Sequence, residues 1–407
     1  MFKPTSLKKI AIVMENLKYG GATTHLLTLI NNKKFKHTQF IIITNKTNNA
    51  VKSILKSCNK KQVKIIYYHS LNITLSKSNF LKLFFFFIKP LLFLISIRQM
   101  YKILDKVNYD LLLANCGGYG DFRSEMASIF ASRLLKKRNI HLLIHHCFSK
   151  PKIWFFLINF INLFIGKIIN GLIFVSFATK KSIKKNTLLF NFFSNKYSVI
   201  YNGIVLRKIK KKKLDYFRTK NGTIKVGMLS RIEAYKGQTD LIEGFNKLPE
   251  ILKVKYKIFF VGSGDAKEVN YLKKKIYDYK LERFIKITKY INKESILILQ
   301  NFNLFFSLTR DFEGFGYSIA EALYAGVPVV STKVGGVTEF LNNKNSILIK
   351  PMDTKSITKI FKDFAYNKKK WKTKIINGKS LIKNNLNSNI MSNNYLNYFI
   401  KNEKIQN

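Results

Sequence analysis

The sequence is poor in cysteine, in acidic residues and in arginine. Its 407 residues include three cysteines, Cys58, Cys116 and Cys147. They are few, widely spaced and without a metal-ligand pattern, which indicates a reducing compartment. Only 22 acidic residues stand against 72 basic ones, so the formal net charge is +50. Nine of the basic residues are arginine, the side chain suited to bidentate contacts with phosphates and base edges, so specific nucleic-acid binding is not expected. The dominance of residues with AT-rich codons indicates a genomic nucleotide bias, although a basic surface would still attract anionic lipid head groups.

Long uninterrupted apolar runs are also absent. Lysine, proline and asparagine break the two most apolar stretches, 81–97 and 153–169, before either reaches the ~20 residues of a membrane-spanning helix. Each stretch is therefore predicted either as a helix buried in the first domain or as a helix docked on a membrane surface. The segment 1–9 has no apolar core of signal-peptide length, so we expect a cytoplasmic protein, free or peripheral on the cytoplasmic face of the membrane.

Apolar runs of strand length alternate with helical patterns along the chain. Hydrophobic residues make up 47% of the sequence, and 407 residues exceed what one core usually supports. This alternation is typical of parallel sheets with crossover helices, and no repeat of fixed period is found. We therefore predict an α/β protein with two doubly wound, Rossmann-like domains that face one another across a cleft. The expected strands are 10–14, 40–44, 63–67, 111–114, 141–144, 172–175 and 198–201 in the first domain, and 224–229, 257–261, 284–288, 304–308 and 327–331 in the second.

The predicted domain limits follow changes in composition. The first domain spans 1–203 and the second spans 223–380, with a lysine-rich linker at 204–222. The Asn- and Lys-rich tail, 381–407, is compatible with a frayed end or with a helix that returns to the first domain.

The most informative segment is a glycine-rich turn bracketed by two carboxylates, Glu313 and Glu321. An apolar run precedes it and strong helix formers follow, so the turn lies at the carboxyl end of a strand, where open α/β sheets bind ligands. Gly314 and Gly316, on either side of Phe315, permit positive φ and close backbone approach, and the first amides of the helix carry the positive end of its dipole. Because no helix lies beside Glu313 for it to cap, we predict that its carboxylate accepts hydrogen bonds from sugar hydroxyls.

Glu321 has two interpretations. Ser318 stands three residues before it, which is the spacing of a capping box, so Glu321 would do no more than stop the helix from fraying. In the other interpretation, Glu321 contacts the ligand. The local sequence supports the two about equally.

Further glycine and cation motifs follow predicted strands. Gly20 and Gly21 open a helix after the first strand, a geometry that admits phosphate or an acceptor oxygen, although a plain β-to-α turn explains them about as well. Arg231 and Lys236 follow the first strand of the second domain, where two fixed cations can neutralise a departing phosphate; otherwise they are solvated surface charges. Gly262 ends another strand within a Gly-x-Gly segment, which taken alone is a weak signal.

These segments together resemble the retaining glycosyltransferases of family four, which are of the group-one type and have the two-Rossmann-domain GT-B fold. Such enzymes carry two glutamates with the separation of Glu313 and Glu321 in a loop of this kind. Other family-like segments occur in the same order: 20–26, 199–204, 227–231 with 236–237, and 326–330 followed by 335–336. The resemblance is strongest from about 199 to 351.

The resemblance implies a role for each motif. Glu313 would orient the donor sugar, while Arg231 and Lys236 would stabilise the diphosphate without a metal ion. Glu321 would bind ribose hydroxyls. A family histidine that reaches the reacting sugar corresponds to one of the adjacent pair at the end of strand 141–144, with His146 favoured for the catalytic role and His145 left to packing or donor contact. The remaining donor-binding candidates are Gly20, Gly21, Gly262, Gly314, Phe315 and Gly316.

The family resemblance also sets the expected reaction and partners. It implies a retaining glycosyltransferase without a cofactor, which moves a sugar from a nucleoside-diphosphate sugar to a hydroxyl of a glycan or lipid-linked acceptor, as in envelope glycan synthesis. The donor nucleotide stays open because the family's usual glycine near strand 284–288 is missing. The cationic composition favours an acceptor at an anionic membrane. Two other classes are a sugar-nucleotide epimerase or glycan phosphorylase on the same scaffold, and a non-catalytic basic protein that binds lipid or nucleic acid.

Overall fold

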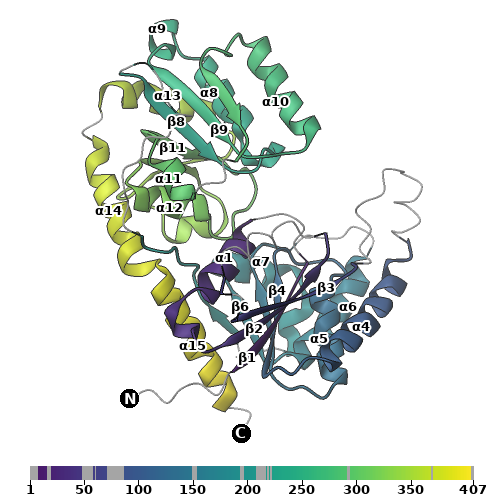
Figure 1. Ribbon diagram of the computed structural model, residues 1–407. Coiled ribbons are helices and arrows are strands. Elements are labelled where there is room, and N and C mark those ends of the chain that lie inside the picture. The colour runs from purple at the N-terminus through teal and green to yellow at the C-terminus, as the bar shows by residue number, and fades with distance from the viewer. Residues whose placement is uncertain are drawn as a thin grey trace. The chain divides into compact units, whose positions relative to one another are not determined.

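The computed structural model describes most of the chain in two compact units. The described residues are 8–15, 20–47, 58–59, 61–70, 87–148, 154–192, 197–207, 217, 220, 222–290, 294–367 and 370–404. The first unit comprises Met1–Gly203 with Ser388–Asn407, and the second comprises Ile204–Asn387. Each unit is a parallel sheet with helices on both faces, which confirms the predicted α/β class (Figure 1).

The sheet of the first unit has the strand order β3-β2-β1-β4-β5-β6-β7, and every pair is parallel. Strands such as β1 are buried along almost their whole length, because a parallel sheet covered on both faces needs apolar residues on both. The strands are β1 (Lys9–Met14), β2 (Gln39–Asn45), β3 (Val63–Tyr68), β4 (Leu111–Cys116), β5 (Ile140–Ile144), β6 (Gly171–Phe174) and β7 (Tyr197–Val199).

Helices cover the two faces of this sheet unequally. One core cluster lies under α4, α5, α6 and α7, and the other lies under α1 and α15. Figure 1 shows α4, α5 and α6 on one side of the sheet and α1 and α15 on the other. The C-terminal helix α15 joins the first unit through hydrogen bonds from Asn32 Nδ2 to Asn389 Oδ1 (3.0 Å) and between His141 Nδ1 and Tyr398 Oη (3.1 Å). The helices are α1 (Gly21–Ile30), η1 (Lys33–Phe35), α4 (Lys89–Asp105), α5 (Ser124–Leu134), α6 (Phe155–Ile168), α7 (Phe177–Asn186), η2 (Leu188–Phe192) and α15 (Ser388–Lys404).

The sheet of the second unit has the order β10-β9-β8-β11-β12-β13, again all parallel. Its strands are β8 (Ile224–Leu229), β9 (Tyr256–Val261), β10 (Ile285–Thr288), β11 (Leu304–Ser307), β12 (Val329–Thr332) and β13 (Ile347–Ile349). Its helices are η4 (Ala234–Lys236), α8 (Gln238–Asn246), α9 (Glu250–Lys253), α10 (Ala266–Asp278), α11 (Ser295–Leu299), α12 (Tyr317–Ala325), η5 (Gly335–Glu339), α13 (Thr354–Tyr366) and α14 (Lys370–Asn385).

The structure differs from the sequence prediction in several details. The predicted strands are all present, but β13 was not predicted, because three residues carry too little periodicity to be recognised. Helix α14 runs through position 381, where the sequence suggested the start of a tail, and the second unit extends to Asn387. Most of the predicted linker, including 208–216, lies outside the described residues.

The two apolar stretches form α4 and α6, while 81–86 and Ile153 lie outside the described residues. Their inner faces enter the core of the first unit, and their outer faces are exposed, so neither is the fully buried helix considered from sequence. In the part of the chain that the structure describes, no helix combines the length and hydropathy needed to cross a bilayer.

Candidate functional site

The predicted cations and acids of the second unit gather at one edge of its sheet. The strand order reverses between β8 and β11, so a crevice is expected at the carboxyl ends of these two strands, which is where open α/β sheets bind ligands. Arg231 and Lys236 follow β8, and Glu313 follows β11. Crossover topology therefore brings together three residues that were singled out separately in the sequence.

Lys236 and Glu313 are in direct contact. Lys236 Nζ donates a hydrogen bond to Glu313 Oε2 at 2.8 Å, and the Thr309 hydroxyl donates to the same oxygen at 3.1 Å. Burial acts to lower the pKa of Lys236, but the adjacent Glu313 carboxylate, with a smaller contribution from Tyr235, raises it overall above its ordinary value. The side chains are 14% and 22% exposed, so the ion pair is shielded yet reachable, and Lys236 stays cationic at neutral pH.

Arg231 lies beside this pair, more exposed to solvent. Its Nη1 is 2.7 Å from Glu233 Oε1, and its Nη2 donates to Tyr235 Oη at 3.0 Å. The ring of Tyr235 in turn lies 4.9 Å from Lys236 Nζ, so Tyr235 links the two cations. The loop after β8 thus presents two positive charges next to the Glu313 carboxylate.

Two glycines allow neighbouring loops to approach the segment that carries Glu313. Gly237 has φ 75°, and a Cβ built on it would lie 2.2 Å from the carbonyl oxygen of Leu308. Gly335 has φ 54°, and a Cβ there would lie 2.2 Å from the carbonyl oxygen of Glu313, which also accepts a 2.7 Å hydrogen bond from Gly336 N. Any larger residue at either glycine would displace the loop, so both positions serve the placement of Glu313.

The glycine-rich turn itself departs in part from expectation. Gly316 has positive φ (83°) and is the N-cap of α12, but Gly314 does not have positive φ. The Phe315 ring is buried against Tyr317 and Phe340, so the aromatic side chain anchors the turn and leaves its backbone as the part able to meet a ligand.

The capping-box interpretation of Glu321 is wrong. Helix α12 begins at Tyr317 after Gly316, with no side-chain cap, so Ser318 already lies inside the helix and cannot act as its N-cap residue. Burial raises the pKa of Glu321 to about 7, and a hydrogen bond with Ser295 acts in the opposite direction. A shielded carboxyl of this kind, one turn into α12, can exchange hydrogen bonds with ligand hydroxyls.

Gly262 lies at the same edge of the second sheet. A Cβ on Gly262 would come within 1.9 Å of the carbonyl oxygen of Ser230, so the loop after β9 packs directly against the loop that carries Arg231. Ile232 N donates to Ser263 O at 3.0 Å, which joins the two loops. Gly262 therefore supports the position of Arg231.

In the first unit, Gly20 is the N-cap of α1 and has extended backbone angles. No atom of the described residues lies within 4 Å of a Cβ built on Gly20, so the described fold does not itself require glycine there. Gly21 is the first residue of α1, as expected from the sequence.

The two adjacent histidines after β5 differ in environment. His145 is buried, its Nε2 donates to Asn115 Oδ1 at 2.7 Å, and its ring lies 4.9 Å from that of His25. Burial, and to a lesser degree His25, holds the pKa of His145 well below its usual range. His146 is less buried, with Nδ1 3.2 Å from Cys147 Sγ. His145 is thus a neutral residue of the interior, and His146 is the more accessible of the two.

A buried acid pair at the carboxyl edge of the first sheet escaped the sequence reasoning. The order of this sheet reverses between β1 and β4, and Glu15 follows β1 directly. Glu15 N donates to Glu125 Oε1, and Ser124 N donates to Glu15 Oε2, both at 2.8 Å. Burial and then the charge of Glu15 raise the pKa of Glu125 to about 7, while Arg123 opposes this. The placement of Glu15 at a strand end was a usable signal, but its partner stands 110 positions away.

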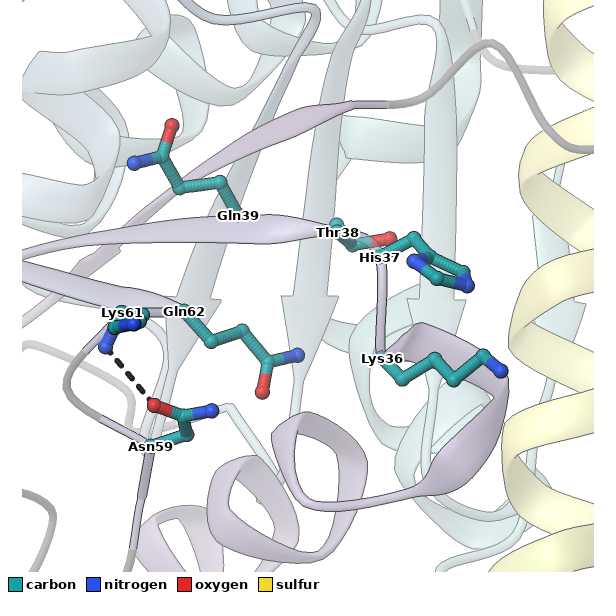
Figure 2. A pocket seen from close by; sticks show the side chains of 7 residues that line it. All are labelled: Lys36, His37, Thr38, Gln39, Asn59, Lys61 and Gln62. Atoms are coloured by element: carbon teal, nitrogen blue, oxygen red, sulfur yellow. Dashed lines mark hydrogen bonds between the residues drawn. The ribbon is translucent and has the colours of Figure 1, made fainter.

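A separate shallow hollow of about 180 Å³ lies at the amino ends of β2 and β3 (Figure 2). It is lined by Lys36, His37, Thr38, Gln39, Asn59, Lys61 and Gln62. These residues hold no carboxylate, and the hollow lies at the opposite edge of the sheet from the glycine turns, so it is not the candidate site. Among the described residues, no group of three or more His, Cys, Asp or Glu side chains is placed to hold a metal ion.

Known proteins resemble this chain in sequence and in fold. Residues 210–380 match the family model of glycosyl transferases group 1. The uncharacterized glycosyltransferase MJ1069 of Methanocaldococcus jannaschii is 28% identical over 311 residues, which cover 73% of this chain and 76% of that protein.

Two solved structures share the fold over nearly the whole chain. The Anabaena protein Alr3699/HepE, in complex with UDP and glucose, has a TM-score of 0.74 at 18% identity and covers 97% of this chain and 100% of its own. A glycosyltransferase from Rickettsia africae has a TM-score of 0.72 at 19% identity, covering 98% and 100%. The shared architecture shows the GT-B fold, and the family match to residues 210–380 together with the archaeal relative supports a group 1 glycosyltransferase.

Proposed function

We propose that this glycosyltransferase uses a nucleoside-diphosphate sugar as donor, transfers the sugar to a hydroxyl of a lipid-linked or envelope glycan acceptor, and retains the anomeric configuration. The observation that carries the proposal is the contact between Lys236 and Glu313 at the switch point of the second sheet, with Arg231 beside it. One set of neighbouring side chains thereby offers cations for a diphosphate and a carboxylate for sugar hydroxyls. The complex of Alr3699/HepE with UDP supports a nucleotide donor of this type.

The cations would act on the leaving group. The Lys236 ammonium has three N–H donors. One donates to Glu313 Oε2, and Nζ is 3.5 Å from Thr309 Oγ1, at the limit of a hydrogen bond, so the group can also donate to a phosphate oxygen. Arg231 would add a second positive charge from the more exposed side of the site. Fixed positive charges at the position where negative charge develops are usually the largest contribution to catalysis of this kind, and in this proposal they replace a metal ion and leave no role for a cofactor.

Glu313 would orient the donor sugar. Two donors, from Lys236 and Thr309, hold its Oε2, so the carboxylate is fixed in place before the donor arrives. Glu321 would meet the ribose hydroxyls, and the backbone of 314–316 and 262 would lie along the donor. In this proposal Gly20 and Gly21 also bind the donor, and His146 acts on the reacting sugar. His145, which is buried, would support His146 through the packing of the strand end.

The proposed transfer occurs on one face of the sugar. The bond between the anomeric carbon and the β-phosphate oxygen breaks, and the acceptor oxygen forms its bond to the same face of that carbon. The acceptor proton passes to the departing phosphate oxygen, which Lys236 and Arg231 stabilise. This route needs no protein nucleophile and keeps the configuration of the donor.

The first experiment identifies the donor. Uridine, guanosine and adenosine diphosphate sugars are incubated with the protein and a membrane extract as acceptor source, and release of free nucleotide is measured. We expect one nucleotide class to be consumed. Glu313→Ala should lower the rate at least a hundredfold, because misplacement of a reacting group by about 1 Å has an effect of that order. Glu282→Ala, an exposed acid on the same unit, is the matched control.

Product analysis separates the transferase from related enzymes on this scaffold. With labelled donor, an epimerase would return an isomeric sugar nucleotide, and a glycan phosphorylase would require inorganic phosphate. A folded Glu313→Ala protein that transfers sugar at the wild-type rate would refute the role assigned to this residue.

A further inference from the structure

The outer faces of α4 and α6 are apolar although they face solvent. On α4 the exposed stripe contains Leu91, Leu94 and Ile95, and on α6 it contains Phe156, Phe160 and Phe164. Phe156 is 84% exposed and Leu94 is 62% exposed. Residues spaced by three or four positions lie on the same side of a helix, so each set forms a continuous stripe. We call these six residues the docking face.

The two stripes belong to one surface. The inner sides of both helices enter the same core cluster, so their outer sides point away from the same face of the sheet (Figure 1). The first turns of the helices are joined by a chain of aromatic contacts, with ring centroids 5.4 Å apart for Phe93 and Phe122 and 6.2 Å apart for Phe122 and Trp154. The N-terminal parts of α4 and α6 are therefore linked through Phe122, which precedes α5, and the docking face lies at that end of both helices.

Positive charge follows the apolar residues along both helices. On α4 the exposed side continues into Arg98 and Lys102, and α6 has Lys167 in its last turn. Helix α6 contains no acidic residue, and in α4 the only one is Asp105 at its end. Apolar residues beside cations are the pattern of helices that lie in the interface of a bilayer, where side chains enter the acyl boundary and cations meet anionic head groups.

The docking face lies near the edge of the first sheet that carries the predicted site residues of this unit. Both helices begin at the carboxyl edge of the first sheet, the edge that also carries Gly20, Gly21 and His146. The apolar residues lie toward that edge and the cations lie away from it. A lipid-linked acceptor held in a bilayer against the docking face would have its polar head near the edge of the first sheet that carries Gly20, Gly21 and His146.

We propose that the docking face, with Arg98, Lys102 and Lys167, binds the surface of an anionic lipid bilayer. A second copy of the chain is a poorer occupant, because two such faces would bring like charges together in a protein with a net charge of +50. The suggestion that membrane binding brings the enzyme to its acceptor rests on the proposed lipid-linked acceptor. Membrane binding itself can be measured without any transfer reaction.

The test compares vesicle binding by the full chain and three-residue variants. Flotation is measured with vesicles of phosphatidylcholine alone and of phosphatidylcholine mixed with phosphatidylglycerol. The apolar variant carries Leu94→Ser, Phe156→Ser and Phe160→Ser and keeps every charge. Its matched control removes exposed apolar residues of the second unit through Ile251→Ser, Val254→Ser and Tyr277→Ser. The cation variant carries Arg98→Gln, Lys102→Gln and Lys167→Gln, and its control carries Lys267→Gln, Lys344→Gln and Lys359→Gln.

We expect the wild type to bind the anionic vesicles, and the apolar and cation variants to bind at least tenfold more weakly, while both controls bind like the wild type. In a second measurement, with the wild type as reference because it already contains Trp154 and Trp371, Phe156→Trp should show additional quenching by brominated lipid in anionic vesicles, and Ile251→Trp should not. Circular dichroism and thermal unfolding establish that each variant is folded.

Three results would overturn the proposal. The apolar variant could bind as tightly as the wild type, which would assign binding to net charge. The cation variant and its lysine control could lose binding equally, which would also assign binding to net charge. Sedimentation could show self-association that the apolar substitutions remove, which would assign the face to a second copy. Thermal stabilisation by sugar nucleotides is measured on the same proteins. Stabilisation without vesicle binding would reject only the docking face. Vesicle binding without stabilisation would reject only the proposed donor.

Discussion

Replacement of Lys236 by alanine is the most direct test of how this site acts on the donor. In the structure, Lys236 Nζ is 2.8 Å from Glu313 Oε2, and the neighbouring carboxylate holds the pKa of the lysine above its ordinary value, so the charge is present throughout the neutral range. If this charge stabilises the departing phosphate, its removal should lower kcat by about 10²–10³, or about 3–4 kcal/mol of transition-state stabilisation.

The same substitution should disturb the fold much less. The ion pair is partly exposed, and after the loss of the lysine Glu313 keeps the hydrogen bond from Thr309 and can be reached by water. We therefore expect the free energy of unfolding to fall by about 1–2 kcal/mol, a modest part of the ~5–15 kcal/mol typical of folded domains. The variant should be folded and able to be assayed.

The assay is nucleotide release at saturating donor, with urea unfolding of the same preparation. Lys267→Ala, which removes an exposed lysine of α10, is the control for charge loss. Lys236→Arg should recover part of the rate, because it restores the charge with a wider, planar geometry. A folded Lys236→Ala enzyme with kcat within threefold of the wild type would refute the reasoning.

Two further predictions concern the glycines and the buried acids. Gly237→Ala should lower the free energy of unfolding by at least ~1 kcal/mol and reduce transfer, since its Cβ would meet the Leu308 carbonyl at 2.2 Å from a backbone with φ 75°. Gly20→Ala should leave urea unfolding nearly unchanged and reduce transfer only; equal destabilisation by both substitutions would contradict the different surroundings of the two glycines. The pKa of Glu125 is about 7 in the folded protein, above its ordinary value of 4.5, so the folded state holds the proton more tightly and stability should fall as pH rises from about 4.5 to 7. Urea unfolding at pH 5 and pH 8 should show a smaller loss for Glu125→Gln than for the wild type, and parallel losses would show that this carboxyl is not the group responsible.

The sequence alone was sufficient to predict the two parallel sheets. Strands covered on both faces require continuous apolar runs, and such runs are local, so β1, β8 and the other predicted strands could be read directly from the residues. The same holds for the glycine turn after β11, where the change from apolar strand to helix formers is visible within a few positions. Very short elements such as β13 carry too little pattern for this.

Contacts between distant positions could not be read in this way. Lys236 and Glu313 stand 77 positions apart, and they meet because the strand order places β8 beside β11, which depends on the crossovers and not on any local pattern. The acid pair of Glu15 and Glu125 is a second case, joined by the neighbouring positions of β1 and β4. Local spacing also left two interpretations of Glu321 open, and the structure excluded the capping box, because the start of α12 at Tyr317 depends on the backbone of Gly316 and not on Ser318.

Exposure is the other property that needed the assembled fold. The apolar stretches 81–97 and 153–169 were compatible with burial or with a membrane surface, since hydrophobicity does not say which side of a helix meets the core. In the folded unit, packing against α5 and the sheet takes up one side of α4 and α6 and leaves Leu94 and Phe156 in solvent. The periodicity of a sequence indicates which secondary structure each segment favours. The order of the strands and the packing of helices on the sheet decide which residues come into contact and which remain exposed to solvent.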